Sequence, residues 1–156
     1  MKLSRFLEHT TLHDSVITAI EYQTVQQRCS FKIELCNYLQ STYQPPDAEI
    51  VLGQLILTGV QRFDSEPKLP LFSDDEQIDA QILTATSLPA DENGVEGWQI
   101  AMQCSDYLRD HDQFFLLTIQ ATDVIWQVEP VIQLNVPYHV FQALENRLTL
   151  EPFVVK

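Results

Sequence analysis

The chain has 156 residues, of which 45% are hydrophobic and 10% aromatic, so it can bury a core and global disorder is excluded. Its net charge of −13, from 22 acidic and 9 basic side chains, disfavours binding to nucleic acid or to anionic membranes and favours a basic partner. No apolar stretch reaches the roughly 18 residues that cross a bilayer, and the first residues lack the apolar run of a secretory signal. We therefore expect a single globular domain over residues 1–156, located in the cytoplasm.

The first third of the chain predicts two strands after an ambiguous start. In residues 1–14, Leu3, Phe6 and Leu7 have helical spacing that two threonines interrupt. From residue 16 the pattern alternates as in a strand, and the cleanest alternation of the chain follows shortly after. The side chains expected on one face are Val16, Thr18, Ile20 and Tyr22 in the first strand, and Cys29, Phe31, Ile33 and Leu35 in the second.

The middle of the chain predicts a further strand between two loops. Prolines mark residues 43–47 as a loop, and residues 50–57 are apolar on both faces, as in a strand that is covered on both sides. Gly53 and Gly59 would permit a bulge or close packing there. Residues 64–76, with two prolines and three consecutive acids, are expected to form a long surface loop.

The strands expected next form a hairpin. Residues 78–88 alternate, and Asn93-Gly94 predicts a type I′ turn, which needs positive φ at both central residues. A charged loop is expected at residues 106–112. After it the alternation changes phase, which implies a bulge or a turn near Thr122-Asp123. The inward side chains expected in this part are Trp98, Ile100, Met102 and Cys104, then Phe115, Leu117, Ile119 and Ala121, and finally Val124, Trp126 and Val128.

The last part of the chain predicts a helix, which begins near Asn135-Val136-Pro137 and is followed by a short apolar tail. Its apolar side chains with helical spacing are Val140, Phe141, Leu144 and Leu148. The predicted fold class is therefore mainly β (α+β): an antiparallel sandwich or strongly curved sheet of six to eight strands with a C-terminal helix. Ten of the apolar residues above should share one core: Cys29, Phe31, Ile33, Leu35, Trp98, Ile100, Met102, Phe115, Leu117 and Ile119.

The sequence contains few residues that suggest catalysis or metal binding. It has no phosphate-binding glycine loop, no GxSxG and no HExxH. On a helix, His9 and His13 would share a face and could bind zinc, with Asp14 or a distant His111 as further ligands. The neighbouring threonines argue against a helix, so no metal and no cofactor are expected. Asp14 is expected to organise the turn before the strand. His111 is expected in a solvated loop, although a histidine between acids could also transfer protons.

The three cysteines are an odd number without regular spacing, which disfavours a disulfide framework or a cysteine zinc site. Cys29 and Cys104 fall on apolar faces, where a free thiol behaves as a small hydrophobe. We expect Cys29, Cys36 and Cys104 to be reduced.

The negative charge is concentrated in one part of the chain. Residues 64–129 contain fourteen acids and two bases, and so hold −12 of the total −13. Acidic loops of this kind can meet a basic partner, with apolar side chains beside them as anchors, or can serve only solubility. The residues predicted to bind are Asp74, Asp75, Glu76, Asp91, Glu92, Asp110, Asp112, Leu71 and Phe72.

The segment Leu12-His13-Asp14-Ser15-Val16-Ile17-Thr18-Ala19-Ile20-Glu21-Tyr22, followed by the strand at residues 29–35, resembles a known pattern. It is similar to the N-terminal strand pair, with His-Asp and a small residue, of small bacterial families of unknown function. Some of these are classed as immunity proteins of polymorphic toxin systems. Residues 57–63 resemble their central strand, but Leu69-Pro70-Leu71-Phe72 stands where they often carry a Trp-Gly or Pro-Trp element. The resemblance implies a protein without enzymatic activity that binds and neutralises a toxin.

Two hypotheses of function follow from these patterns. The first is a non-enzymatic cytosolic protein-binding domain, immunity-like, that meets a basic protein through acidic loops. The alternative is a small-molecule-binding β domain, with weak hydrolytic chemistry at His13 or His111. A flat or convex acidic surface would favour the first, and a concave apolar pocket with a few converging polar groups the second.

Overall fold

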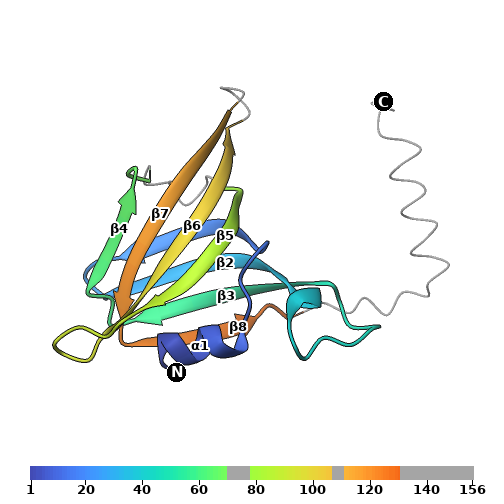
Figure 1. Cartoon of the computed structure of the whole chain (residues 1–156), viewed down its shortest axis with the longest axis horizontal. Coiled ribbons are helices and arrows are strands. Elements are labelled where there is room, and N and C mark those ends of the chain that lie inside the picture. The colour runs from blue at the N-terminus through green and yellow to red at the C-terminus, as the bar shows by residue number, and fades with distance from the viewer. Residues whose placement is uncertain (70–77, 107–110, 131–156) are drawn as a thin grey trace, which may run out of the picture.

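The computed structural model describes residues 1–69, 78–106 and 111–130, which fold mainly into β-structure (Figure 1). This confirms the predicted fold class in its main feature. The predicted helix after Pro137 and the apolar tail lie outside the described residues. The elements are α1 Leu3–His9, β1 Val16–Gln23, β2 Arg28–Cys36, the 3-10 helix η1 Asn37–Leu39, β3 Ile50–Thr58, β4 Arg62–Glu66, β5 Ala80–Leu88, β6 Glu96–Asp106, β7 His111–Ala121 and β8 Asp123–Val128.

All eight strands belong to one antiparallel sheet, which closes on itself as a cylinder. Its order is β4-β7-β6-β5-β1-β2-β3-β8. Each strand at an end of this order continues a strand that lies within it: β4 continues β3, and β8 continues β7. The two ends of the sheet therefore meet at a common corner, where the sheet closes. At this corner the Thr122 N–H donates to the Thr58 carbonyl (3.0 Å) and the Gln61 N–H to the Gln120 carbonyl (2.9 Å). Of the two predicted architectures, the strongly curved sheet is therefore confirmed (Figure 1).

Two glycines allow this close approach of strands, as the sequence predicted. Gly59 has a φ of +62° at the corner, and a Cβ there would collide with the Thr122 side chain. A Cβ at Gly53 would collide with the indole of Trp126 and lie 2.8 Å from the Gln127 carbonyl oxygen. The change of phase predicted near Thr122-Asp123 is also confirmed, since β7 ends at Ala121 and β8 begins at Asp123.

The inner face of the cylinder is filled with apolar side chains, and all ten residues predicted to form the core are buried there. Helix α1 closes one end of the cylinder with Leu3 and Phe6. The Trp98 Nε1–H donates to the Leu3 carbonyl (3.0 Å), and the Phe6 and Trp98 rings lie 5.5 Å apart. The ambiguous N-terminal segment is thus helical because its apolar face covers the core.

A β-bulge corrects the predicted faces of the first strand. The pairing of β1 with β2 shifts register between Ile17 and Ala19, so Thr18 is the additional residue. Ile17 is fully buried as a result, whereas Val16, which was predicted to point with Thr18 and Ile20, is only half-buried. Strand β5 has a second register shift, with Leu83 as the additional residue.

The turn between β5 and β6 confirms the predicted hairpin but not its type. The Gly94 N–H donates to the Asp91 carbonyl (3.0 Å), and Gly94 has a φ of +77° whereas Asn93 does not have positive φ. A type I turn followed by a left-handed glycine therefore replaces type I′. The reason is the Asp91 carboxylate, which accepts hydrogen bonds from the N–H groups of Asn93 and Val95, both at 2.9 Å.

Two segments that were predicted as loops have ends that belong to strands. Residues 64–66 lie in β4, although the sequence indicated a loop from residue 64 onward. Asp106 and His111 pair with each other as the last residue of β6 and the first of β7. Both corrections have one cause, because pairing with a long neighbouring strand outweighs a local charged composition.

Candidate functional site

The outer surface of β5, β6 and β7 is a sheet face with uncharged side chains between its ends. Alternation along each strand points the core residues inward and their neighbours outward. Amide and hydroxyl side chains dominate these outward positions: Gln81, Gln99, Gln103, Gln120, Thr84, Thr86 and Thr118. We call this surface the uncharged face. Over the whole chain 20% of the residues are charged, whereas this face is depleted of charge, as the centres of protein interfaces are.

Two large apolar side chains lie on β7, the strand of the uncharged face that borders β4. Phe114 is 60% exposed and Leu116 is 39% exposed, and both point outward from β7. Ala101 of β6 pairs directly with Leu116. An exposed aromatic residue beside an exposed leucine forms a small apolar centre, the kind of anchor that protein interfaces use.

Exposed carboxylates lie around the uncharged face, and we call them the acidic rim. Glu66 of β4 pairs with Leu116, and Asp64 pairs with Thr118. Asp112 lies at one end of β7, where its Oδ2 accepts a hydrogen bond from Gln103 Nε2 (2.5 Å). Asp79 precedes β5 at that same end, and Glu92 lies in the β5–β6 turn at the opposite end. Arg62 reduces the net charge beside β4, because its Nε lies 2.5 Å from Asp64 Oδ2.

Only three of the predicted binding residues lie in the described part of the chain, and they have different surroundings. Glu92 and Asp112 belong to the acidic rim, whereas the carboxylate of Asp91 is engaged by backbone N–H groups of its own turn. The other predicted residues, Asp74, Asp75, Glu76, Asp110, Leu71 and Phe72, lie outside the described residues. Phe114 and Leu116 were not predicted from the sequence. Their signal is present, since both stand on the side of β7 that otherwise carries Asp112, Thr118 and Gln120.

His13 and Asp14 lie where β1 meets β5. In the described part of the chain, these two strands pair through only two residue pairs. His13 Nδ1 lies 2.6 Å from the Leu83 carbonyl, at the bulge of β5. Because a carbonyl only accepts hydrogen bonds, Nδ1 carries a proton. Nε2 lies 3.4 Å from Asp14 Oδ1, which also accepts a hydrogen bond from Gln81 Nε2 (2.9 Å). Asp14 has a φ of +64°.

This geometry is the reverse of that of a catalytic histidine. In a Ser-His-Asp arrangement the carboxylate holds Nδ1 and leaves Nε2 facing the nucleophile. Here both ring nitrogens of His13 face groups of the protein, and Asp14 occupies the Nε2 side. The pair therefore fastens the start of β1 to the bulge of β5, in place of the purely local turn expected for Asp14. The backbone of His111 begins β7 and not a solvated loop, and its side chain lies outside what is described.

The arrangement that would have allowed His9 and His13 to share a helix face is not formed, because α1 ends at His9. In the described parts of the chain, no three His, Cys, Asp or Glu side chains come together as metal ligands.

Burial lowers the reactivity of two of the three free thiols. It raises the pKa of the Cys29 thiol from an ordinary 9.0 to about 12, with a further contribution from Glu21. Burial also raises the pKa of Cys104, and the negative charge of the nearby Asp79 raises it further. Since the thiolate is the reactive form, neither group is suited to nucleophilic chemistry at neutral pH.

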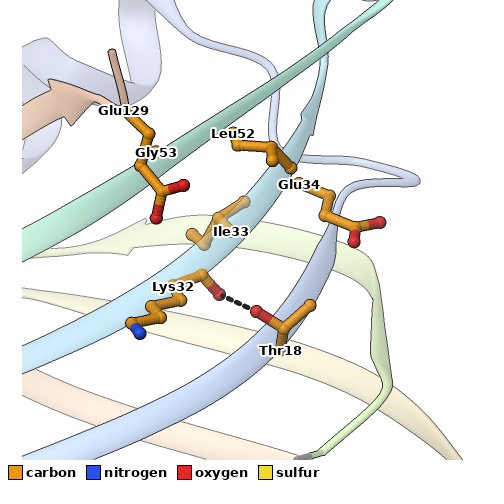
Figure 2. Close-up of a pocket in the computed structure, with 7 residues that line it drawn as sticks. All are labelled: Thr18, Lys32, Ile33, Glu34, Leu52, Gly53 and Glu129. Atoms are coloured by element: carbon orange, nitrogen blue, oxygen red, sulfur yellow. Dashed lines mark hydrogen bonds between the residues drawn. The ribbon is translucent and has the colours of Figure 1, made fainter. Parts of the chain in front are cut away.

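The outer face of β1, β2 and β3 contains two small hollows. One has a volume of about 190 Å³ and is lined by Thr18, Lys32, Ile33, Glu34, Leu52, Gly53 and Glu129. Figure 2 shows the ends of Lys32 and Glu129 on one side of Ile33 and the Glu34 carboxylate on the other. The second hollow, of about 170 Å³, is lined by Glu21, Gln23, Arg28, Ser30 and Gln54. Both are smaller than the roughly 300–1,000 Å³ of typical ligand sites, and both carry charges of both signs.

No protein-family model, no curated protein and no solved structure matches this chain. In the part of the chain that the structure describes, no helix has the length and apolar character needed to span a membrane.

Proposed function

We propose that the chain is a protein-binding domain without enzymatic activity, and that the uncharged face with its acidic rim is where a basic protein docks. The observation that carries this proposal is the position of Phe114 and Leu116, which lie exposed on β7 with Gln103 and Ala101 of β6 on one side and Glu66 of β4 on the other. An apolar, charge-depleted centre with a polar rim is the usual composition of a protein interface.

The acidic rim supports the choice of a basic partner. Rim charges change the interaction mainly through the rate of encounter, because an exposed carboxylate attracts a basic surface before contact but contributes little energy after it. Phe114 and Leu116 would then determine how slowly the complex dissociates, since buried apolar anchors carry most of the binding energy. If the resemblance of residues 12–22 to immunity families extends to function, the basic partner is a toxin that binding neutralises.

The alternative, a small-molecule site with hydrolytic chemistry, receives less support. The two hollows on β1, β2 and β3 are small and charged, and both ring nitrogens of His13 are engaged. A convex face of a closed sheet suits contact with another protein better than enclosure of a ligand.

The proposal is tested by capture with matched variants. The wild-type chain, the double variant Phe114→Ser/Leu116→Ser and the control variant Leu52→Ser/Ile125→Ser are immobilised and exposed to lysate of the native organism. Both variants replace two exposed apolar side chains, but only the first lies on the uncharged face. We expect a basic protein that the wild type and the control retain and the first variant loses. Equal retention by both variants, or retention of acidic proteins only, would contradict the proposal.

A further inference from the structure

The outer face of β3 and β8 carries a second set of exposed apolar side chains. Ile50 and Leu52 of β3 are 45% and 49% exposed, and Ile125 of β8 is 48% exposed. All three point outward, because they alternate with core residues such as Leu55 and Val124. We call these three side chains the β3–β8 row. The described part of the chain leaves this row open to solvent.

The chain that follows β8 starts beside this row. The Glu129 N–H donates to the Leu52 carbonyl (2.9 Å), so the chain passes Leu52 as it leaves the sheet. Residues 131–136 can span at most about 20 Å, at roughly 3.4 Å per residue. The residues after them can therefore return over the outer face of β3 and β8 and reach either end of the row.

The composition of residues 131–156 favours burial against an apolar surface. Fourteen of these 26 residues are hydrophobic, a larger share than the 45% of the whole chain. The segment contains two acidic and two basic side chains, so it holds none of the net charge of −13. Contact between this segment and the rest of the chain therefore brings no net repulsion.

The spacing of apolar residues predicts an amphipathic helix over residues 137–149, with a proline in its first turn. One face of this helix carries Val140, Phe141, Leu144 and Leu148, and the opposite face carries Gln142, Glu145, Asn146 and Thr149. A helix with one apolar face needs an apolar surface to pack on, because helices of this length are marginally stable alone in water.

The apolar face of the predicted helix matches the β3–β8 row in length. From Val140 to Leu148 a helix rises about 12 Å, at 1.5 Å per residue. Ile125 pairs with Ile56, four residues along β3 from Leu52. This places the two ends of the row about 13 Å apart. A helix about 10 Å wide also covers two adjacent strands.

We propose that residues 137–149 form an amphipathic helix that packs on the β3–β8 row of the same chain. Because the helix is tethered beside the row, its effective concentration there is on the order of millimolar, and a small apolar contact suffices. The helix would cover this second apolar surface and leave Phe114 and Leu116 as the exposed apolar centre for a partner. The inference concerns the other half of the sheet and does not depend on the proposed function.

The test is hydrogen exchange of the full chain without a partner, followed by mass spectrometry of peptides from residues 137–149. It compares the wild type with Leu52→Ser/Ile125→Ser and with the control Phe114→Ser/Leu116→Ser, each of which replaces two exposed apolar side chains. In the wild type and the control, exchange of these amides should be roughly tenfold or more slower than in Leu52→Ser/Ile125→Ser. Only that variant removes the surface on which the helix packs.

Four results would overturn the inference. These are fast exchange of residues 137–149 in the wild type, equal protection in all three proteins, equal loss of protection in both variants, and protection that grows with protein concentration. The last result would assign the row to the segment of a second copy. Each of them leaves the proposed function standing, because the capture test reads the uncharged face.

A cross-link gives a second measurement in case Leu52→Ser/Ile125→Ser does not keep the slow exchange of β2 and so does not fold. A short bismaleimide should join the two new thiols of Leu52→Cys/Leu144→Cys within one chain, as identified by the mass of the joined peptides. The control Leu116→Cys/Leu144→Cys should not be joined. Equal cross-linking of both proteins, or none in the first, would overturn the inference.

Discussion

The two halves of the closed sheet share one interior but have different exteriors. Strands β1, β2, β3 and β8 carry outward charges of both signs, including Arg28, Lys32 and Glu34, and two polar hollows (Figure 2). Strands β5, β6 and β7 carry amides and hydroxyls around Phe114 and Leu116, with carboxylates at the margin. The core of both halves consists of buried apolar side chains, although Val128, which was predicted to point inward, is 56% exposed at the end of β8. Core packing thus determines which residues can point inward, whereas the outward residues of each strand can differ between the halves and can form a binding surface.

The largest change in unfolding free energy is expected between substitutions on the inner and the outer side of one strand, β7. Leu117 is fully buried and its neighbour Leu116 points outward. Leu117→Ala should lower the free energy of unfolding by about 2–5 kcal/mol, because it leaves a cavity in the core. Leu116→Ala should lower it by less than about 1 kcal/mol, as is usual for surface positions. Urea denaturation of both variants measures the difference, and equal losses would contradict the assignment of inner and outer faces.

The interior of the other half predicts a dependence on pH. The pKa of Cys29 is raised from 9.0 to about 12, so the native state favours the protonated thiol. Its contribution is fully present below pH 9 and is lost as the pH rises toward 12, by up to about 1.4 kcal/mol of unfolding free energy per pH unit. Urea denaturation of the wild type and Cys29→Ala across this range should show their stability difference shrinking. A difference independent of pH would show that the thiol is not buried as described.

The smallest effect concerns the junction between the halves. His13→Ala removes the hydrogen bond to the Leu83 carbonyl and the contact with Asp14. Because the imidazole is more than half exposed, the loss in unfolding free energy should be about 0.5–1.5 kcal/mol. Amide hydrogen exchange should increase first at Asp14 and Ile82, whose backbones pair across this junction. Faster exchange spread evenly over the sheet would mean that His13 supports the whole fold and not the junction.

The buried side of a strand was predictable from the sequence wherever apolar and polar residues alternate strictly, because only one of the two sides can then face the core. Residues 29–35 are the clearest example, because apolar and polar side chains take turns without exception. The bulge at Thr18 was not predictable, since its apolar neighbours read equally well in either phase. Strand β4 was missed because Arg62–Glu66 is mostly polar, and only pairing with β7 makes it a strand. The closure at Gly59 and Thr122 joins residues far apart in the chain, which local patterns do not encode.

The candidate site was predictable in charge but not in shape. Glu92 and Asp112 were identified as acids beside turns, and both lie on the acidic rim. Phe114 and Leu116 were missed because they are interleaved with the buried Phe115 and Leu117, so the run reads as one apolar segment. The alternation that turns Phe115 and Leu117 inward also turns Phe114 and Leu116 outward, but whether another element covers that outer face follows only from the tertiary fold.

The most direct test of the account is the association rate of the captured partner with two charge-matched variants. Glu66→Gln/Asp112→Asn removes two carboxylates from the acidic rim, and Glu34→Gln/Glu129→Gln removes two from the other half, so both variants have the same net charge. If the uncharged face is the docking surface, only the first variant should bind more slowly than the wild type at low salt, and high salt should abolish the difference. Equal slowing by both variants would show that net charge alone attracts the partner, and slowing by the second variant only would place the docking surface on the opposite half.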